Sequence, residues 1–154
     1  MRLALYQPDI PQNLGAAIRL CACLGVALDI IEPCGFPLTS TALKRAALDY
    51  GESAQLARHD SLSAFKSAPE RDGGRLVLVE TDGAVGFQNF QFSTGDTLLL
   101  GRESAGSPGA LYEAAQASVR VSMKAGLRSL NVVTAAAVVL TEAMRQTGAW
   151  EKLQ

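Results

Sequence analysis

Short runs of hydrophobic residues alternate along the chain with longer segments in which hydrophobic residues recur every three or four positions. The short runs are typical of strands buried in a parallel sheet, and the longer segments are typical of helices that cover one. We expect strands at 2–7, 27–32, 54–58, 75–80, 97–101 and 118–123. We expect helices at 14–25, 40–50, 61–68 and 131–148. This alternation predicts an α/β fold, with a mostly parallel sheet flanked by helices.

Capping residues mark the ends of the first and last predicted helices. Asn13 is expected to be the N-cap of the first helix, which Gly25 then ends. Ser129 or Asn131 is expected to cap the closing helix, and Gly148 to end it.

The closing helix has an unusual composition, because Thr134 is the only polar residue between Val132 and Leu140. A helix that is apolar on nearly all sides must be buried on more than one side. In a chain this small, a second copy can supply the missing cover, so we expect a homodimer through the C-terminal helix. The alternative is a central core helix in a monomer.

Length and composition indicate one globular domain spanning residues 1–154. With 48% hydrophobic and 19% charged residues, the chain can bury enough surface to fold. Its apolar runs are shorter than the roughly 18 residues that cross a bilayer, and no signal peptide precedes them, so we expect a cytoplasmic protein. Three cysteines and one histidine suit neither a disulfide framework nor a zinc site, and we expect no metal. A Ser–His–Asp mechanism would require His59, which has no nucleophile motif nearby.

The charges are balanced overall but unevenly placed. The net charge of −1 is unusual for a nucleic-acid-binding protein. However, three segments contain basic residues and no acidic residue: 10–28, 33–48 and 114–141. Contacts with RNA phosphates depend on local positive charge, so net charge does not exclude RNA.

Three segments combine glycine with polar residues at junctions between strands and helices, where ligands bind in open α/β sheets. They are N13-L-G-A-A-I-R19, G101-R-E-S-A-G106-S-P and K124-A-G-L-R-S-L-N131. None of them is a P-loop or a dinucleotide-binding fingerprint. From the residues alone, Arg19 either extends to solvent or binds a ligand, and Glu103 is either a surface charge or orients one. In the second segment, Ser107-Pro108 is expected to start a helix.

In this order and at these positions, the three segments resemble the motifs of the SPOUT superfamily of trefoil-knotted RNA methyltransferases. The resemblance covers essentially the whole chain and is closest to the small tRNA (cytidine/uridine-34) 2′-O-methyltransferases of the TrmL (YibK-like) type. It implies a C-terminal deep trefoil knot, which general topology rules would not suggest. It also implies S-adenosylmethionine as cofactor and methyl transfer to the ribose 2′-OH of the wobble nucleotide in the tRNA anticodon stem-loop, with leucine tRNAs as substrates.

The resemblance also assigns roles to residues of this chain. The implied catalytic residues are Asn13, Arg19, Glu103, Ser129 and Asn131. The implied cofactor-binding residues are Val79, Gly101, Glu103, Gly106, Val121, Met123, Ser129 and Leu130. The implied substrate-binding residues are Arg19, Lys44, Arg45, Lys124 and Arg128. Because a guanidinium hardly ever loses its proton in a protein, we expect Arg19 to bind a phosphate and stabilise the developing alkoxide.

The chain departs from this family pattern at two positions. Ser122 stands where relatives commonly have proline, and Thr141 stands where they commonly have tyrosine. Two other functions stay open at this point. One is the same chemistry at another tRNA position or on ribosomal RNA, and the other is a non-catalytic, knotted RNA-binding module.

Overall fold

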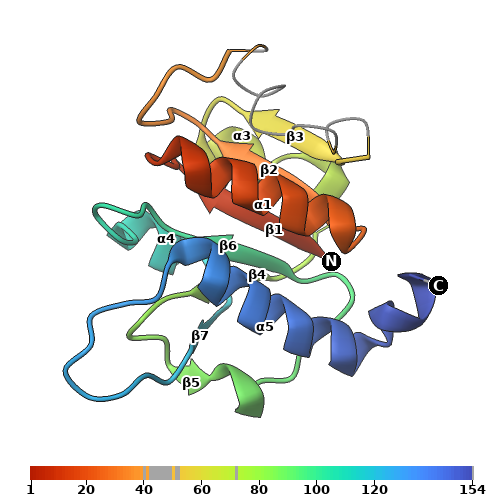
Figure 1. The fold of residues 1–154 in the computed structure, drawn as a ribbon, viewed down its shortest axis with the longest axis vertical. Coiled ribbons are helices and arrows are strands. Elements are labelled where there is room, and N and C mark those ends of the chain that lie inside the picture. The colour runs from red at the N-terminus through yellow and green to blue at the C-terminus, as the bar shows by residue number, and fades with distance from the viewer. Residues whose placement is uncertain (40, 42–49, 51–52, 72, 154) are drawn as a thin grey trace.

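The computed structural model contains a parallel β-sheet of seven strands among the residues it describes, which are all except 40, 42–49, 51–52, 72 and 154 (Figure 1). The strands are β1 (Arg2–Tyr6), β2 (Ala27–Ile31), β3 (Leu56–His59), β4 (Leu76–Val79), β5 (Val85–Gly86), β6 (Thr97–Leu100) and β7 (Ala117–Arg120). Their order in the sheet is β3-β2-β1-β6-β4-β7-β5, and each pairing is parallel. The predicted α/β class and parallel sheet are confirmed.

The central strands are mostly hydrophobic because both faces of the sheet are covered. Helices α1 (Pro11–Cys23) and α5 (Val132–Thr147) lie on one face, and α3 (Leu62–Lys66) and α4 (Gly109–Ala114) lie on the other (Figure 1). Three short 3-10 helices complete the described elements: Pro69–Arg71, Phe87–Asn89 and Ala149–Leu153. This layering is the reason that the strand sequences show no alternation of apolar and polar residues.

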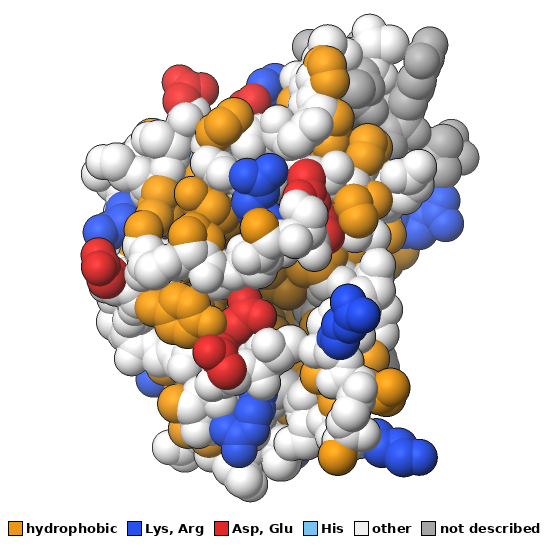
Figure 2. Space-filling model, turned by 90° about the vertical axis from the view of Figure 1, so that its left-hand side faces the viewer, with side chains coloured by type: hydrophobic (Ala, Val, Ile, Leu, Met, Phe, Trp, Pro, Cys, Tyr) orange, Lys and Arg blue, Asp and Glu red, His pale blue; other side chains and the backbone are white. Residues whose placement is uncertain are grey.

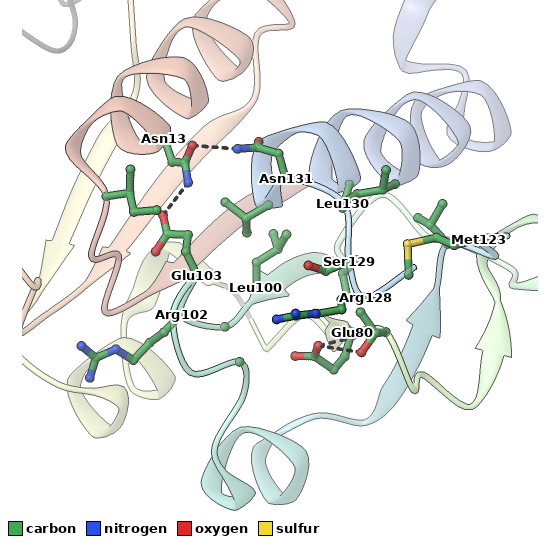
Figure 3. A pocket seen from close by; sticks show the side chains of 18 residues that line it. Asn13, Glu80, Leu100, Arg102, Glu103, Met123, Arg128, Ser129, Leu130 and Asn131 are labelled. Atoms are coloured by element: carbon green, nitrogen blue, oxygen red, sulfur yellow. Dashed lines mark hydrogen bonds between the residues drawn. The ribbon is translucent and has the colours of Figure 1, made fainter. Parts of the chain in front are cut away.

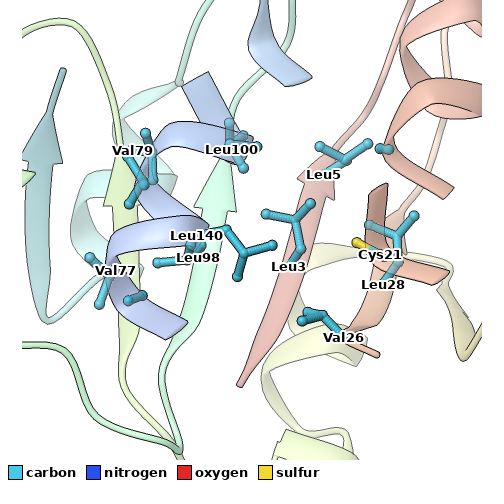
Figure 4. Packing of buried hydrophobic residues seen from close by; sticks show 14 of the residues in the cluster. Leu3, Leu5, Cys21, Val26, Leu28, Val77, Val79, Leu98, Leu100 and Leu140 are labelled. Carbon is cyan, nitrogen blue, oxygen red and sulfur yellow. The ribbon is translucent and has the colours of Figure 1, made fainter. Parts of the chain in front are cut away.

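Alternate residues of the four central strands β1, β2, β4 and β6 contribute to two separate hydrophobic clusters. Leu3 and Leu98 face α1 and α5, where they pack in a cluster with Leu140 (Figure 4). Ala4 and Leu99 point to the opposite face, toward α3 and α4. Successive side chains of a strand point to opposite faces, so one apolar run supplies both clusters.

The helix ends were predicted with one clear error. Asn13 is not an N-cap, because α1 begins two residues earlier, at Pro11, and Ile10 is its N-cap. Proline suits the first turn of a helix, since its fixed φ fits and its missing N–H is not needed there. Asn13 therefore lies within the first turn, with only 9% of its surface exposed. At the other end, Gly25 follows α1 with φ +62°, as expected of a residue that ends a helix.

The predictions for the later helices need smaller changes. Asn131, and not Ser129, caps α5, and Gly148 ends the helix with φ +68°. The helix expected to start at Ser107-Pro108 is α4, which begins at Gly109 with Pro108 as its N-cap. The helix predicted at 40–50 lies almost entirely outside the described residues.

The strand predicted at 118–123 is also partly wrong, since β7 ends at Arg120. Val119 and Arg120 pair with the two residues of β5, and on the other side β4 ends opposite Val119. Beyond Arg120 neither neighbouring strand offers further backbone groups for pairing. Residues 121–123 therefore continue as a loop at the carboxyl edge of the sheet.

The only histidine has a structural position at the end of the outer strand β3. His59 Nε2 lies 2.7 Å from Oδ1 of the fully buried Asp29, whose carboxylate also accepts two hydrogen bonds from the Arg2 guanidinium. Burial of Asp29 is tolerable because both of its oxygens are paired.

Among the described residues, no helix is both long and apolar enough to cross a membrane.

Candidate active site at the carboxyl edge of the sheet

A cavity of about 420 Å³ lies where β4 and β6 end, between the first turns of α1 and α5. Figure 2 views this edge and shows a hollow with hydrophobic side chains at its base and charged side chains around it. The lining residues are Ile10, Asn13, Val79, Glu80, Thr81, Leu100, Gly101, Arg102, Glu103, Gly106, Val121, Met123, Arg128, Ser129, Leu130, Asn131, Val132 and Ala135. Because the strands are parallel, their carboxyl ends meet at one edge, and loops distant in sequence surround one space.

Most of the residues that the sequence singled out lie in this cavity. All eight expected cofactor-binding residues line it, as do Asn13, Glu103, Ser129 and Asn131 of the five expected catalytic residues. Lys124 lines a neighbouring hollow of about 290 Å³. Arg128, expected to bind substrate, lines the main cavity. Lys44 and Arg45 lie outside the described residues.

Arg19 does not line the cavity of its own chain. It is exposed on α1, and its guanidinium carbon lies 5.1 Å from the centre of the Tyr50 ring. A cation over an aromatic face is weakly attracted to it but remains free to bind an anion. Within one chain, Arg19 therefore lies apart from the four other residues expected to be catalytic.

Three polar side chains form a continuous hydrogen-bonded chain across the cavity wall (Figure 3). Asn131 Oδ1 accepts from the backbone N–H groups of Val133 and Thr134, so its amide nitrogen must point the other way. That nitrogen donates to Asn13 Oδ1 at 2.9 Å, and Asn13 Nδ2 in turn donates to Glu103 Oε1 at 3.1 Å. The N-terminal end of α5 thereby fixes the orientation of the side-chain amides of Asn131 and Asn13. As a result, Asn13 Nδ2 is directed at the Glu103 carboxyl as a hydrogen-bond donor.

The Glu103 carboxyl is close to a second acidic group. Its Oε2 accepts from the backbone N–H of Asp9 at 2.9 Å, and the Asp9 carboxylate accepts from the Ser104 hydroxyl and lies 3.7 Å from Arg102 Nε. Burial, and then the neighbouring Asp9 carboxyl, raise the pKa of Glu103. Hydrogen bonds from Glu103 and Ser104 lower the pKa of Asp9. Glu103 is therefore the member of the pair better suited to hold or accept a proton.

The loop after β6 requires glycine because its backbone folds closely on itself. Arg102 and Gly106 exchange two backbone hydrogen bonds of 3.0 and 2.9 Å, and Gly106 has φ +67°. A Cβ at Gly101 would lie 2.8 Å from the carbonyl carbon and oxygen of Gly106, and would collide with Ser107 Oγ. Ser107 Oγ is itself buried and makes no hydrogen bond with the described residues. A side chain at position 101 would therefore push this wall out of place.

The cavity suits a ligand that has one apolar part and one polar part. Val79, Leu100, Val121, Met123 and Leu130 supply apolar surface, while the backbone of the loops after β4 and β6 supplies polar groups. Its volume lies within the range of small-molecule sites, about 300–1,000 Å³. The residues present thus fit an adenosine-type ligand, which needs an apolar slot for the purine and polar contacts for the rest.

Sequence reasoning missed some polar residues of the cavity, above all Glu80 and Thr81. Both directly follow β4, next to the expected cofactor-binding Val79. The general rule that ligands bind beyond the carboxyl ends of parallel strands could have identified them. Glu80 is half-buried and its carboxyl points into the cavity (Figure 3).

Fold and site together define a parallel α/β protein with a small-molecule cavity formed by the loops after β4, β6 and β7. The chain belongs to the SpoU rRNA Methylase family, whose model matches residues 1–141. A tRNA (cytidine(34)-2′-O)-methyltransferase of Beijerinckia indica is 50% identical over 98% of this chain and 94% of the relative. One of the same name from Escherichia coli K12 is 39% identical over 96% of this chain and 94% of the relative.

Solved structures agree with this membership. One, from work on 2-OH methylation of C/U34 on tRNA, has a TM-score of 0.85 and 40% identity, and the match covers 94% of both chains. The SpoU methyltransferase AviRb of Streptomyces viridochromogenes, solved with AdoMet, has a TM-score of 0.82 and 26% identity. That match covers 95% of this chain and 60% of AviRb.

Proposed function

We propose that this protein transfers a methyl group from S-adenosylmethionine to the ribose 2′-OH of the wobble nucleotide, position 34, of tRNA. The observation that carries the proposal is the meeting of Asn13, Glu103, Ser129 and Asn131 in one cavity. The chain that forms this cavity matches relatives named for that reaction along nearly their whole length. Leucine tRNAs are the substrates to test first.

The cavity would hold the cofactor through apolar side chains and loop backbone. S-adenosylmethionine supplies, when bound, an electrophilic methyl group on a sulfonium, which needs no imidazole for its transfer. Val121, Met123 and Leu130 would pack against the purine, and Gly101 lets the backbone approach the ligand closely. Ser129, exposed on the rim, would contact the polar part.

The ribose hydroxyl is a weak nucleophile that must lose its proton. Glu103 has the raised pKa of a group that can accept one, and the Asn13–Asn131 chain holds its carboxyl in place. Arg19 would bind the adjacent phosphate and stabilise the developing alkoxide. Because Arg19 lies outside its own cavity, it would act through an RNA that extends onto α1 or in a cavity shared with a second chain.

The proposal includes a homodimer through α5 and a deep trefoil knot formed by the C-terminal segment. Helix α5 buries Ala136, Val139 and Leu140 on its own sheet, whereas Val138, on the other side of the helix, remains partly exposed. A valine in that position supports a subunit interface. Lys124 lies in the exposed loop before α5, where it would contact tRNA. The free thiols of the three cysteines are typical of a cytoplasmic protein.

The test is methylation of purified leucine tRNA anticodon stem-loops by the recombinant protein, with mass spectrometry of the nucleosides. We expect a 2′-O-methyl group at position 34 that depends on S-adenosylmethionine. Arg19→Ala should abolish the transfer while S-adenosylmethionine still raises the Tm; near-normal turnover would contradict the role of Arg19. Methylation at another RNA position, or RNA binding without cofactor binding, would favour one of the two other functions.

The proposed dimer has a separate test. Sedimentation at micromolar concentration should show a dimer, and Val138→Glu should dissociate it by placing a charge in the apolar interface. A wild-type protein that sediments only as a monomer would contradict the interface.

A further inference from the structure

The cavity contains two side chains of opposite charge that do not pair with each other. Glu80 Oε1 accepts from the backbone N–H and, at 3.4 Å, the hydroxyl of Thr81, whereas Glu80 Oε2 makes no hydrogen bond with a described residue. Arg128 makes neither a hydrogen bond nor an ion pair with any described residue, although it lines the same cavity. Both side chains point into the cavity, from the end of β4 and from the loop before α5 (Figure 3).

The other charged groups of the cavity are already engaged. Glu103 accepts from Asn13 and from the Asp9 backbone, and Arg102 turns away from the cavity toward Asp9 (Figure 3). The charges left for a ligand are therefore one carboxylate and one guanidinium. A ligand with a cation and an anion close together at one end complements this arrangement.

We propose that Glu80 binds the α-ammonium group, and Arg128 the α-carboxylate, of the amino-acid end of S-adenosylmethionine. This inference rests on the proposed function, because it assigns residues to the cofactor of that reaction. The cofactor's amino-acid end is a zwitterion, and the apolar part of the cavity accounts for its purine. A carboxylate receives an ammonium well, and a guanidinium can bind a carboxylate through two parallel hydrogen bonds.

The same geometry argues against RNA phosphate as the partner of Arg128. A phosphate at the guanidinium inside this cavity would also approach the Glu80 carboxylate, and two like charges in a partly enclosed space repel each other. Lys124, four residues earlier, lines the separate neighbouring hollow and meets no such carboxylate among the residues that line it. The loop therefore offers Lys124 for RNA and Arg128 for the cofactor.

The test compares ligands that differ only at the amino-acid end, by isothermal titration calorimetry. S-adenosylhomocysteine carries both charged groups, its decarboxylated analogue lacks the carboxylate, and 5′-methylthioadenosine lacks the whole amino-acid end. Glu80→Gln should lower the affinity for S-adenosylhomocysteine and for its decarboxylated analogue about ten-fold. Arg128→Gln should lower the affinity for S-adenosylhomocysteine by a similar factor and leave that for the decarboxylated analogue unchanged. Neither substitution should change binding of 5′-methylthioadenosine by more than about two-fold.

The control is Glu113→Gln, on the exposed side of α4 and outside the cavity, which should bind all three ligands like the wild type. Equal weakening of S-adenosylhomocysteine and 5′-methylthioadenosine by Glu80→Gln would overturn the inference in favour of a contact with the ribose. If Arg128→Gln binds S-adenosylhomocysteine like the wild type but binds tRNA more weakly, Arg128 does not bind the α-carboxylate of the cofactor, and that part of the inference is overturned. A wild type that binds none of the three would refute the proposed function itself, and this inference with it.

Discussion

Replacing Gly101 by alanine tests how closely the cavity wall is packed. The new Cβ would lie 2.8 Å from the Gly106 carbonyl carbon and oxygen, and ordinary contact needs about 3.4 Å, so the wall must move by about 0.6 Å. That movement strains the two hydrogen bonds between Arg102 and Gly106, each of which contributes about 1 kcal/mol. Alanine also lowers the entropy of the unfolded chain, which offsets up to about 1 kcal/mol. We expect a net loss of about 1–2 kcal/mol in the free energy of unfolding.

The assay is equilibrium unfolding in urea followed by circular dichroism, with S-adenosylhomocysteine affinity measured in parallel. The matched control is Gly109→Ala at the start of α4, where a Cβ meets nothing within 4 Å. This variant should be as stable as the wild type or more stable by up to about 1 kcal/mol. Gly101→Ala should also bind the ligand more weakly, because the displaced wall forms part of the cavity. A Gly101→Ala protein within about 0.5 kcal/mol of the wild type would refute the packing argument.

Three further predictions concern the polar groups. Asn131→Ala removes the cap of α5 and should cost about 1 kcal/mol of stability, measured in urea, whereas Ser129→Ala should cost little. The pKa of Glu103 is raised in the folded state, so protonation of its carboxyl stabilises the folded protein. This contribution is complete below the ordinary pKa of 4.5 and is lost as pH rises through the pKa of the folded protein. Unfolding free energies between pH 4 and pH 8 should therefore show the wild type losing its advantage over Glu103→Gln as pH rises; a constant difference would contradict this. Asp29→Asn leaves the Arg2 guanidinium without its buried carboxylate and should lower the free energy of unfolding by about 3 kcal/mol; an unchanged Tm would contradict the importance of this pair.

The central strands were predictable because burial on both faces makes them mostly apolar. The runs at 75–80 and 97–101 contain β4 and β6, each of which is completely buried. Strand β7 ends three residues before the end of the strand predicted at 118–123, because its length depends on how far β4 and β5 extend beside it. Pairing partners are a property of the assembled sheet and leave little trace in the sequence of one strand.

The candidate site was predictable as a set of segments but not as a set of contacts. The motif around Gly101 indicated a ligand loop, and the structure shows why glycine stands there. Asn13 was interpreted as a helix cap, yet its side chain joins Glu103 and Asn131 instead. Capping rules consider only neighbours along the chain, whereas this side chain turns to partners from other elements.

The sequence by itself determined the α/β class, the ends of its first and last helices at Gly25 and Gly148, and the segments that line the cavity. These features follow from apolar periodicity, backbone preferences and short motifs, all of which act over a few neighbouring residues. Only the tertiary structure decided that Asn13 and Asn131, 118 positions apart, share a hydrogen bond, that Arg19 lies outside the cavity, and that Glu80 and Arg128 face into it unpaired. The physical reason is that strand order and helix packing set these distances, and they depend on the burial of the whole chain.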